Sequence, residues 1–92
     1  MPVTVSIIVK GKVQGVFYRQ SSKEKALNTG ITGRVMNHAD GSVHILATGT
    51  QEQLDDFIAW CRQGPSKARV TDVSVEKVPL QNFDTFSIHR NF

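Results

Sequence analysis

The stretch that decides the fold follows an alternating apolar segment and reads Gly11-Lys12-Val13-Gln14-Gly15-Val16-Phe17-Tyr18-Arg19. Its two glycines allow the backbone to turn tightly, so that several amide N–H groups can point into one concavity. The amino end of a helix favours anions, because its first amides are unpaired and the helix dipole is positive there. Arg19 adds a planar guanidinium that can bind a phosphate or a carboxylate bidentately. The features of this 11–19 loop are therefore suited to binding an anion.

The 11–19 loop differs from the two best-known nucleotide-binding loops. A Walker P-loop contains Gly-Lys-Ser/Thr, and no such sequence follows Gly15. A dinucleotide-binding fingerprint has a third glycine and a downstream acidic residue for the ribose, and both are missing here. Taken alone, the stretch leaves two interpretations open: an anion-binding loop, or a turn between a strand and a helix that has no ligand.

Alternating apolar residues on both sides of this loop predict a series of strands. The first segment alternates Val3, Val5, Ile7 and Val9. Asp40-Gly41 is a strong hairpin signal between two further segments. The predicted strands cover about residues 3–10, 33–38, 43–48 and 70–78, and a short last strand contains Phe86 and Ile88.

Two helices complete the predicted pattern. The first covers about residues 20–29 and ends at Gly30, which provides a left-handed cap. Its apolar face is predicted to be thin, because Ala26 and Leu27 are its only clearly apolar residues. The second begins at the capping box Thr50-Gln51-Glu52-Gln53, in which the first and last residues satisfy free backbone amides. Its buried face, at helical spacing, is predicted to contain Leu54, Phe57, Ile58 and Cys61.

The predicted order is strand, helix, strand, strand, helix, strand, with a short terminal strand. This order is typical of the ferredoxin-like α+β fold, a βαββαβ sandwich with an antiparallel sheet of four to five strands and two helices on one face. The first two strands are then parallel, and ligands in open α/β sheets favour the carboxyl ends of parallel strands. Asn37, at the end of the second strand, is therefore predicted to lie beside the 11–19 loop.

Composition and charge restrict the class of protein. The chain has 92 residues, 39% hydrophobic and 21% charged, which indicates a single globular domain over residues 1–92. It has no apolar run of about 18 residues, no signal-peptide pattern at its start, and one cysteine, which excludes an internal disulfide. These features predict a cytoplasmic protein without a membrane partner. The net charge of +3 is scattered, which favours small anions over nucleic acid as ligands.

The motifs of this chain, in their order and spacing, resemble those of the acylphosphatase family. The two leading motifs are Gly11-x-Val13-Gln14-Gly15-Val16-x-Tyr18-Arg19 and Gly30-x-Thr32-Gly33-x-Val35-x-Asn37-x-x-Asp40-Gly41-x-Val43. The resemblance extends over essentially the whole chain through Gly64-Pro65, Ala68-Arg69-Val70 and Phe86-x-Ile88. It implies a ferredoxin-like enzyme that hydrolyses carboxyl-phosphate anhydrides without a metal, a cofactor or a covalent phosphoenzyme.

The resemblance also implies roles for individual residues. Arg19 corresponds to the arginine that binds the phosphate, and Asn37 to the asparagine that orients the attacking water. The phosphate cradle would be formed by the backbone amides of Gly15, Val16, Phe17, Tyr18 and Arg19. Inorganic phosphate, as a product, is expected to compete with the substrate.

The chain departs from the family pattern at four positions. Tyr18 stands where phenylalanine is common, Thr29 where leucine is usual, Arg34 where an aromatic residue is frequent, and Met36 where a basic or polar residue is frequent. None of these changes falls on the two catalytic candidates. They bear on substrate preference, rate and stability rather than on the chemistry.

Other phosphate chemistries lack their essential residues. A cysteine-dependent phosphatase needs a thiolate inside the phosphate loop, whereas Cys61 is predicted on the core face of the second helix. The histidines show no metal-ligand spacing with one another or with carboxylates, so no metal site is predicted at His38, His44 or His89. Asp40 is predicted to serve the turn. His38 either tunes the pH response of the site or occupies a solvated hairpin position.

Two other functions share parts of this pattern. RNA-recognition domains have the same order of elements but stack bases on aromatic residues of the central strands, and residues 3–8 and 42–47 contain no such residue. A non-catalytic regulatory module of acylphosphatase type is the second alternative, and the pair Arg19 and Asn37 argues against it. We therefore expect a monomeric hydrolase of small acyl phosphates that does not bind nucleic acid.

Overall fold

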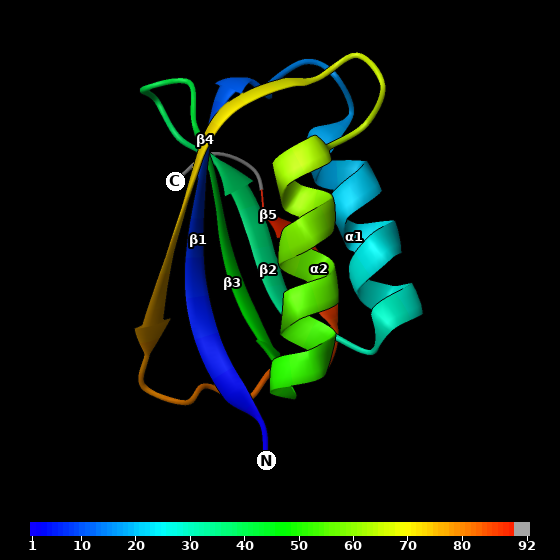
Figure 1. Ribbon diagram of the computed structural model, residues 1–92, viewed down its shortest axis with the longest axis vertical. Coiled ribbons are helices and arrows are strands. Elements are labelled where there is room, and N and C mark those ends of the chain that lie inside the picture. Colours follow the sequence, from blue (N-terminus) through cyan, green and yellow to red (C-terminus); the bar gives the residue numbers. More distant parts are fainter. Residues whose placement is uncertain (90–92) are drawn as a thin grey trace.

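The computed structural model describes residues 1–89, in which the alternating segments form a five-stranded sheet with two helices on one face (Figure 1). The strands are β1 (Val3–Lys12), β2 (Thr32–Asn37), β3 (Val43–Gly49), β4 (Arg69–Val78) and β5 (Phe86–His89). The helices are α1 (Tyr18–Thr29) and α2 (Gln51–Gln63). Neither helix is long and apolar enough to span a membrane. The predicted order is confirmed, and α1 begins two residues earlier than predicted, so that Tyr18 and Arg19 belong to its first turn.

The strands lie in the order β4-β1-β3-β2-β5. β3 pairs antiparallel with both β1 and β2, so β1 and β2 point in the same direction, as the ferredoxin-like fold requires. β5 pairs in parallel with β2, with Phe86 beside Gly33 and Ile88 beside Val35. The expectation of a purely antiparallel sheet is therefore wrong at this one pair, and the sheet is mixed.

β5 runs parallel to β2 because segment 79–85 first crosses one end of the sheet, from the β4 edge to the β2 edge (Figure 1). Two buried hydroxyls fix this crossing. The Oγ1 atoms of Thr4 and Thr48 are 2.7 Å apart, and each also forms a hydrogen bond with the backbone of Gln81. The crossing delivers the chain to the end of the sheet at which β2 begins, so the next strand has the direction of β2.

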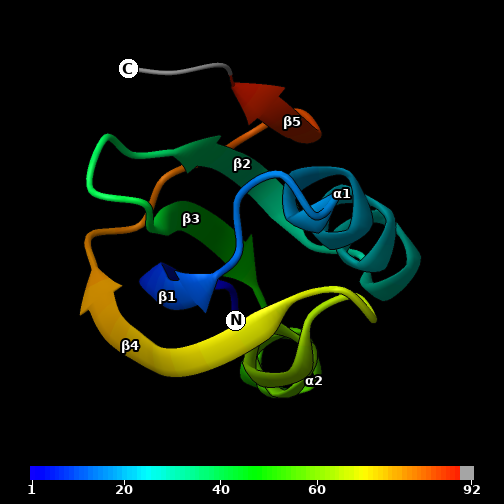
Figure 2. The same ribbon diagram turned by 90° about the horizontal axis from the view of Figure 1, so that it is seen from above.

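As a result, β1, β2 and β5 end at the same edge of the sheet, and α1 begins there. Figure 2 looks onto this edge and shows the segment between β1 and α1 arching along it. The fold therefore brings together the end of the 11–19 loop, Asn37 at the end of β2 and His89 at the end of β5. Sequence reasoning predicted the first two of these neighbours but not the third.

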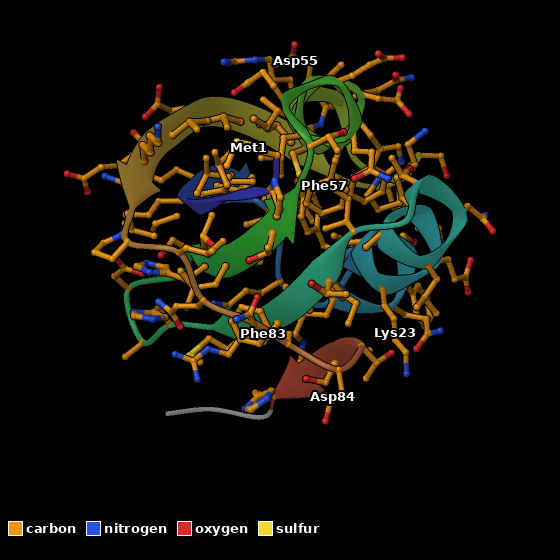
Figure 3. The ribbon with its side chains drawn as sticks, turned by 90° about the horizontal axis from the view of Figure 1, so that it is seen from below. Met1, Lys23, Asp55, Phe57, Phe83 and Asp84 are labelled. Carbon is orange, nitrogen blue, oxygen red and sulfur yellow. The ribbon has the colours of Figure 1, made fainter. Side chains whose placement is uncertain are left out.

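Apolar side chains fill the space between the sheet and the helices. Phe57 of α2 lies at the centre of this layer (Figure 3), with its ring centroid 5.9 Å from that of Phe86. The strands contribute the buried residues Val5, Ile7, Val9, Val35, Val43, Ile45 and Ala47. The predicted capping box of α2 is confirmed, and three residues of its predicted face are buried, whereas Ile58 is only half-buried.

The apolar face of α1 is thin, as expected, and Tyr18 provides most of it. Leu27 is 51% exposed, so the expectation that it shares this face is wrong. The buried Tyr18 hydroxyl donates a hydrogen bond to the carbonyl oxygen of Cys61 at 2.7 Å, and the Tyr18 ring centroid lies 5.3 Å from that of Trp60. The Tyr18 side chain therefore connects α1 to α2.

Candidate active site

A cavity of about 340 Å³ opens at the edge where α1 begins. Its polar lining consists of Gly15, Arg19, Gln20 and Asn37, and its apolar lining of Val13, Phe17, Tyr18 and Ile88. Arg19 and Asn37, on two different elements, therefore lie in one cavity, as predicted. The only charged side chain on the described lining is that of Arg19, so the cavity is suited to an anion.

Two residues in the left-handed conformation bend the 11–19 loop before α1. Gly15 has a φ of 74°, and Phe17, the residue that precedes the helix, has a φ of 64°. The amide of Ser21 donates to the carbonyl of Phe17 at 3.0 Å and so makes the first hydrogen bond of the helix. The amides of Tyr18, Arg19 and Gln20 precede that bond and have no acceptor within the helix. They are therefore suited to an anion.

Gly11 differs from its expected role in the loop. Gly11 does not turn the chain but belongs to β1, at an irregularity of the β1–β4 pairing. A Cβ atom at Gly11 would collide with the carbonyl oxygen of Arg69, which explains why the position requires glycine. The Val16 side chain is buried in the core, so only the backbone of this residue is available to a ligand.

Gln14 connects the loop to the hairpin between β2 and β3. Its Nε2 atom donates hydrogen bonds to the carbonyl oxygens of His38 at 2.7 Å and Ser42 at 2.9 Å. His38 directly follows Asn37, so this contact fixes the chain next to Asn37 relative to the 11–19 loop. Sequence reasoning missed this role, because both acceptors are backbone atoms that no sequence motif reveals.

Arg19 is half-buried in the first turn of α1. Its Nη1 atom donates a hydrogen bond to the carbonyl oxygen of His89 at 3.2 Å, so β5 helps to orient the guanidinium. Among residues 1–89, no carboxylate forms an ion pair with Arg19. A guanidinium has five N–H donors, and those not used for His89 can bind a ligand.

Asn37 contains an unusual polar atom. Its Oδ1 is buried and has no hydrogen-bond partner within the described part of the chain. Leaving such an acceptor unpaired costs on the order of 1–3 kcal/mol, and most buried polar atoms of proteins therefore bond to protein or to ordered water. Because Asn37 lines the cavity, a water molecule or a ligand in the cavity can supply the missing donor.

The other predicted residues lie outside the cavity. Asp40 accepts hydrogen bonds from the hydroxyl and the amide of Ser42, which lower the pKa of its carboxyl and confirm its role in the turn. His38 is half-buried, and its ring stacks on that of His44 with centroids 3.3 Å apart. No three His, Cys, Asp or Glu side chains of residues 1–89 are grouped as a metal site would require.

Cys61 is buried on α2, as predicted. Burial raises the pKa of its thiol to about 12. The side chain therefore stays a neutral thiol near neutral pH, and it is not among the residues that line the cavity.

Comparison with known proteins gives a consistent result. A family model described as acylphosphatase matches residues 5–88. The chain is similar to the acylphosphatase of Methylococcus capsulatus, with 43% identity over 95% of this chain and 96% of that protein. The acylphosphatase of Colwellia psychrerythraea is 39% identical over 96% of this chain and 99% of its own length. The crystal structure of acylphosphatase from Bacillus subtilis has a TM-score of 0.92, with 37% identity over 97% of this chain and 99% of that chain.

Proposed function

The chain belongs to the acylphosphatase family, and on that premise we propose that residues 1–92 form one domain in which Arg19 and Asn37 hydrolyse acyl phosphates. Membership of the family gives the activity, which is hydrolysis of an acyl phosphate. The proposal concerns how this chain performs it. We also propose that the enzyme is monomeric and cytoplasmic, and that inorganic phosphate inhibits it competitively.

The phosphate of the substrate binds at the amino end of α1. The amides of Gly15, Val16, Phe17, Tyr18 and Arg19 surround its oxygens, and the guanidinium of Arg19 neutralises its charge. The left-handed conformations in the loop and the first amides of the helix, which have no acceptor within it, support this assignment. The hydrogen bond from Arg19 to the His89 carbonyl supports a preorganised guanidinium, which needs little rearrangement as charge develops.

Asn37 binds the attacking water. Its Oδ1 accepts a hydrogen bond from the water, whose oxygen lone pair is then free to attack phosphorus. The new bond between water and phosphorus forms as the bond to the acyl oxygen breaks. A neutral amide is not a base, so the proton of the water passes to a phosphate oxygen, and the products are a carboxylate and inorganic phosphate.

An acyl phosphate suits a site with so few reactive groups. Its carboxylate is a good leaving group, and phosphoryl transfer passes through a loose transition state in which positioning and charge stabilisation are the main requirements. Loss of one preorganised donor of this kind costs about 3–4 kcal/mol, or about 10²–10³ in rate. Arg19, which both binds and stabilises charge, is expected to contribute at least as much.

One observation supports this mechanism most strongly. The buried Oδ1 of Asn37 lacks a partner among residues 1–89 and lies on the same cavity as Arg19, the only charged residue on the described lining. A water acceptor and an anion binder are the two groups that direct attack of water on a phosphate needs.

The test is hydrolysis of benzoyl phosphate in the presence of EDTA. The wild type should turn over, and inorganic phosphate should inhibit it competitively. Arg19→Ala and Asn37→Ala should each reduce kcat/KM by about 10²-fold or more. Arg62→Ala and Asn82→Ala are matched controls, since both residues are exposed and neither lines the cavity, and each should stay within about twofold of the wild type.

Circular dichroism and urea unfolding establish that the two active-site variants are folded. Retained activity in both folded variants would contradict the proposed mechanism. A folded wild type with no hydrolysis would instead favour a regulatory module that kept the fold.

A further inference from the structure

Part of the cavity lining is apolar, although phosphate chemistry does not require it. Five large apolar side chains of residues 1–89 are exposed: Met1, Phe17, Leu27, Val75 and Leu80. Phe17 is the only one of these that lines the cavity, and it is 75% exposed. An aromatic ring of this size is normally removed from water. Its position on the lining and its exposure together place the ring at the mouth of the cavity.

Neither packing nor helix capping explains the phenylalanine at this position. Phe17 has φ 64° and ψ 23°, a left-handed conformation that glycine adopts freely and that is strained for other residues. It precedes α1, yet its side chain makes no capping hydrogen bond. Glycine or asparagine would fit this backbone better. Strained residues that persist are concentrated at functional sites.

A second apolar residue that is accessible to solvent also lines the cavity. Ile88 of β5 lines the cavity and is only half-buried. It immediately precedes His89, whose carbonyl accepts the hydrogen bond from Arg19. The backbone of one short strand therefore orients the phosphate-binding guanidinium while a neighbouring side chain of that strand offers apolar surface to the cavity.

The cavity thus combines polar and apolar surfaces. Arg19 and Asn37 are suited to the phosphate and the water, and Phe17 and Ile88 are suited to an uncharged group attached to that phosphate. No acidic residue and no lysine of residues 1–89 lines the cavity, so a charge on the attached group has no partner beyond Arg19.

We propose that Phe17 and Ile88 form a subsite for the acyl group, which makes this enzyme selective for acyl phosphates with aromatic or branched apolar acyl groups. The inference rests on the proposed function and names its substrate class. The subsite contacts the hydrocarbon part of the acyl group, and this part of the substrate hardly changes as the phosphorus–oxygen bond breaks. It therefore stabilises substrate and transition state equally, and its loss should raise KM rather than lower kcat.

The test compares benzoyl phosphate with acetyl phosphate, whose acyl group is a single methyl. The measured quantity is the ratio of kcat/KM for the two substrates. In Phe17→Ala, this ratio should fall by about threefold to tenfold, mainly because KM for benzoyl phosphate rises. Alanine is chosen because it keeps a Cβ atom, so the loop backbone does not gain the freedom that glycine would give it. Ile88→Ala should shift the ratio in the same direction.

Two further variants separate the ring from other effects. Phe17→Trp retains an aromatic face and should keep the ratio within about twofold of the wild type. Leu80→Ala removes an exposed apolar side chain that does not line the cavity, and the ratio should not change. Thermal unfolding of each variant checks that the comparison is made between folded proteins.

A ratio that stays within about twofold of the wild type in folded Phe17→Ala would overturn the subsite. An equal fall in kcat/KM for both substrates would also overturn it, because the ring would then support the loop rather than bind the acyl group. Failure of the proposed function looks different: the wild type then hydrolyses neither substrate.

Discussion

The Nη1 atom of Arg19 and the carbonyl oxygen of His89 are 3.2 Å apart, although 70 positions separate the two residues in the sequence. This hydrogen bond connects the first turn of α1 to the end of β5. Because β5 lies beside β2 at the edge of the sheet, the orientation of Arg19 depends on the same strand pair that presents Asn37 to the cavity.

Arg19→Lys should lose most of the activity although it keeps the positive charge. A lysine ammonium is a point charge and lacks the planar fork with which an arginine can bond the His89 carbonyl and a phosphate together. We expect kcat/KM for benzoyl phosphate to fall by about 10²-fold. Steady-state kinetics check this, and near wild-type activity in Arg19→Lys would show that charge alone suffices.

Gln14→Ala should reduce both stability and turnover. The substitution removes two hydrogen bonds and leaves the carbonyls of His38 and Ser42 without this donor, which should cost about 1–3 kcal/mol in urea unfolding. The chain next to Asn37 is then less well fixed, and kcat should fall about tenfold. Gln63→Ala, at an exposed position of α2, is the control and should change neither. A loss of stability with unchanged kcat would limit Gln14 to a structural role.

Tyr18→Phe should destabilise the fold although it removes only one oxygen atom. The Tyr18 hydroxyl bonds the carbonyl of Cys61, which belongs to the last turn of α2 and has no partner within that helix. Its removal should lower the free energy of unfolding by about 1–3 kcal/mol. Ser74→Ala, which removes an exposed hydroxyl, should cost less than about 0.5 kcal/mol. Equal effects of the two variants would contradict this role.

The protein should lose stability at alkaline pH in part through Cys61. Burial raises the pKa of this thiol to about 12, so above pH 9 the unfolded chain releases its proton while the folded chain retains it. The free energy of unfolding should therefore fall as pH rises from 9 towards 12, by up to about 1.4 kcal/mol per pH unit. Burial also raises the pKa of Tyr18, which adds to the loss above pH 10.

Urea unfolding at pH 7, 9 and 10.5 measures this dependence. Cys61→Ala should start from a lower stability at pH 7, because it removes a buried side chain, but its alkaline decline should be shallower than that of the wild type. Parallel declines would show that the thiol does not contribute.

The sequence was sufficient for the order of elements and for the neighbourhood of Arg19 and Asn37. Alternating apolar residues, the capping box at Thr50 and the Asp40-Gly41 turn are local signals, and each matches the observed element. The ferredoxin-like topology then implies that the ends of β1 and β2 meet. That step needs only the order of the strands, so it could be made without coordinates.

Other features depend on tertiary packing and could not be predicted. The direction of β5 follows from the path of segment 79–85, which Thr4 and Thr48 fix through a backbone partner. Phe17 has a left-handed backbone, which is typical of glycine and not of phenylalanine, so no local signal predicts this conformation. The acceptors of Gln14 are carbonyl oxygens, and every residue type has one.

The parallel pairing of β5 with β2 has a consequence for refolding. β2 and β5 are separated by most of the second half of the described chain, and bringing distant strands together costs entropy that their contacts repay only after pairing. The pair Tyr18–Trp60 reports the docking of α1 on α2, whereas the contact between Arg19 and His89 forms only when β5 has docked. During refolding, we therefore expect the return of catalytic activity to follow the docking of β5, and the change in tryptophan fluorescence to follow the assembly of the helical layer.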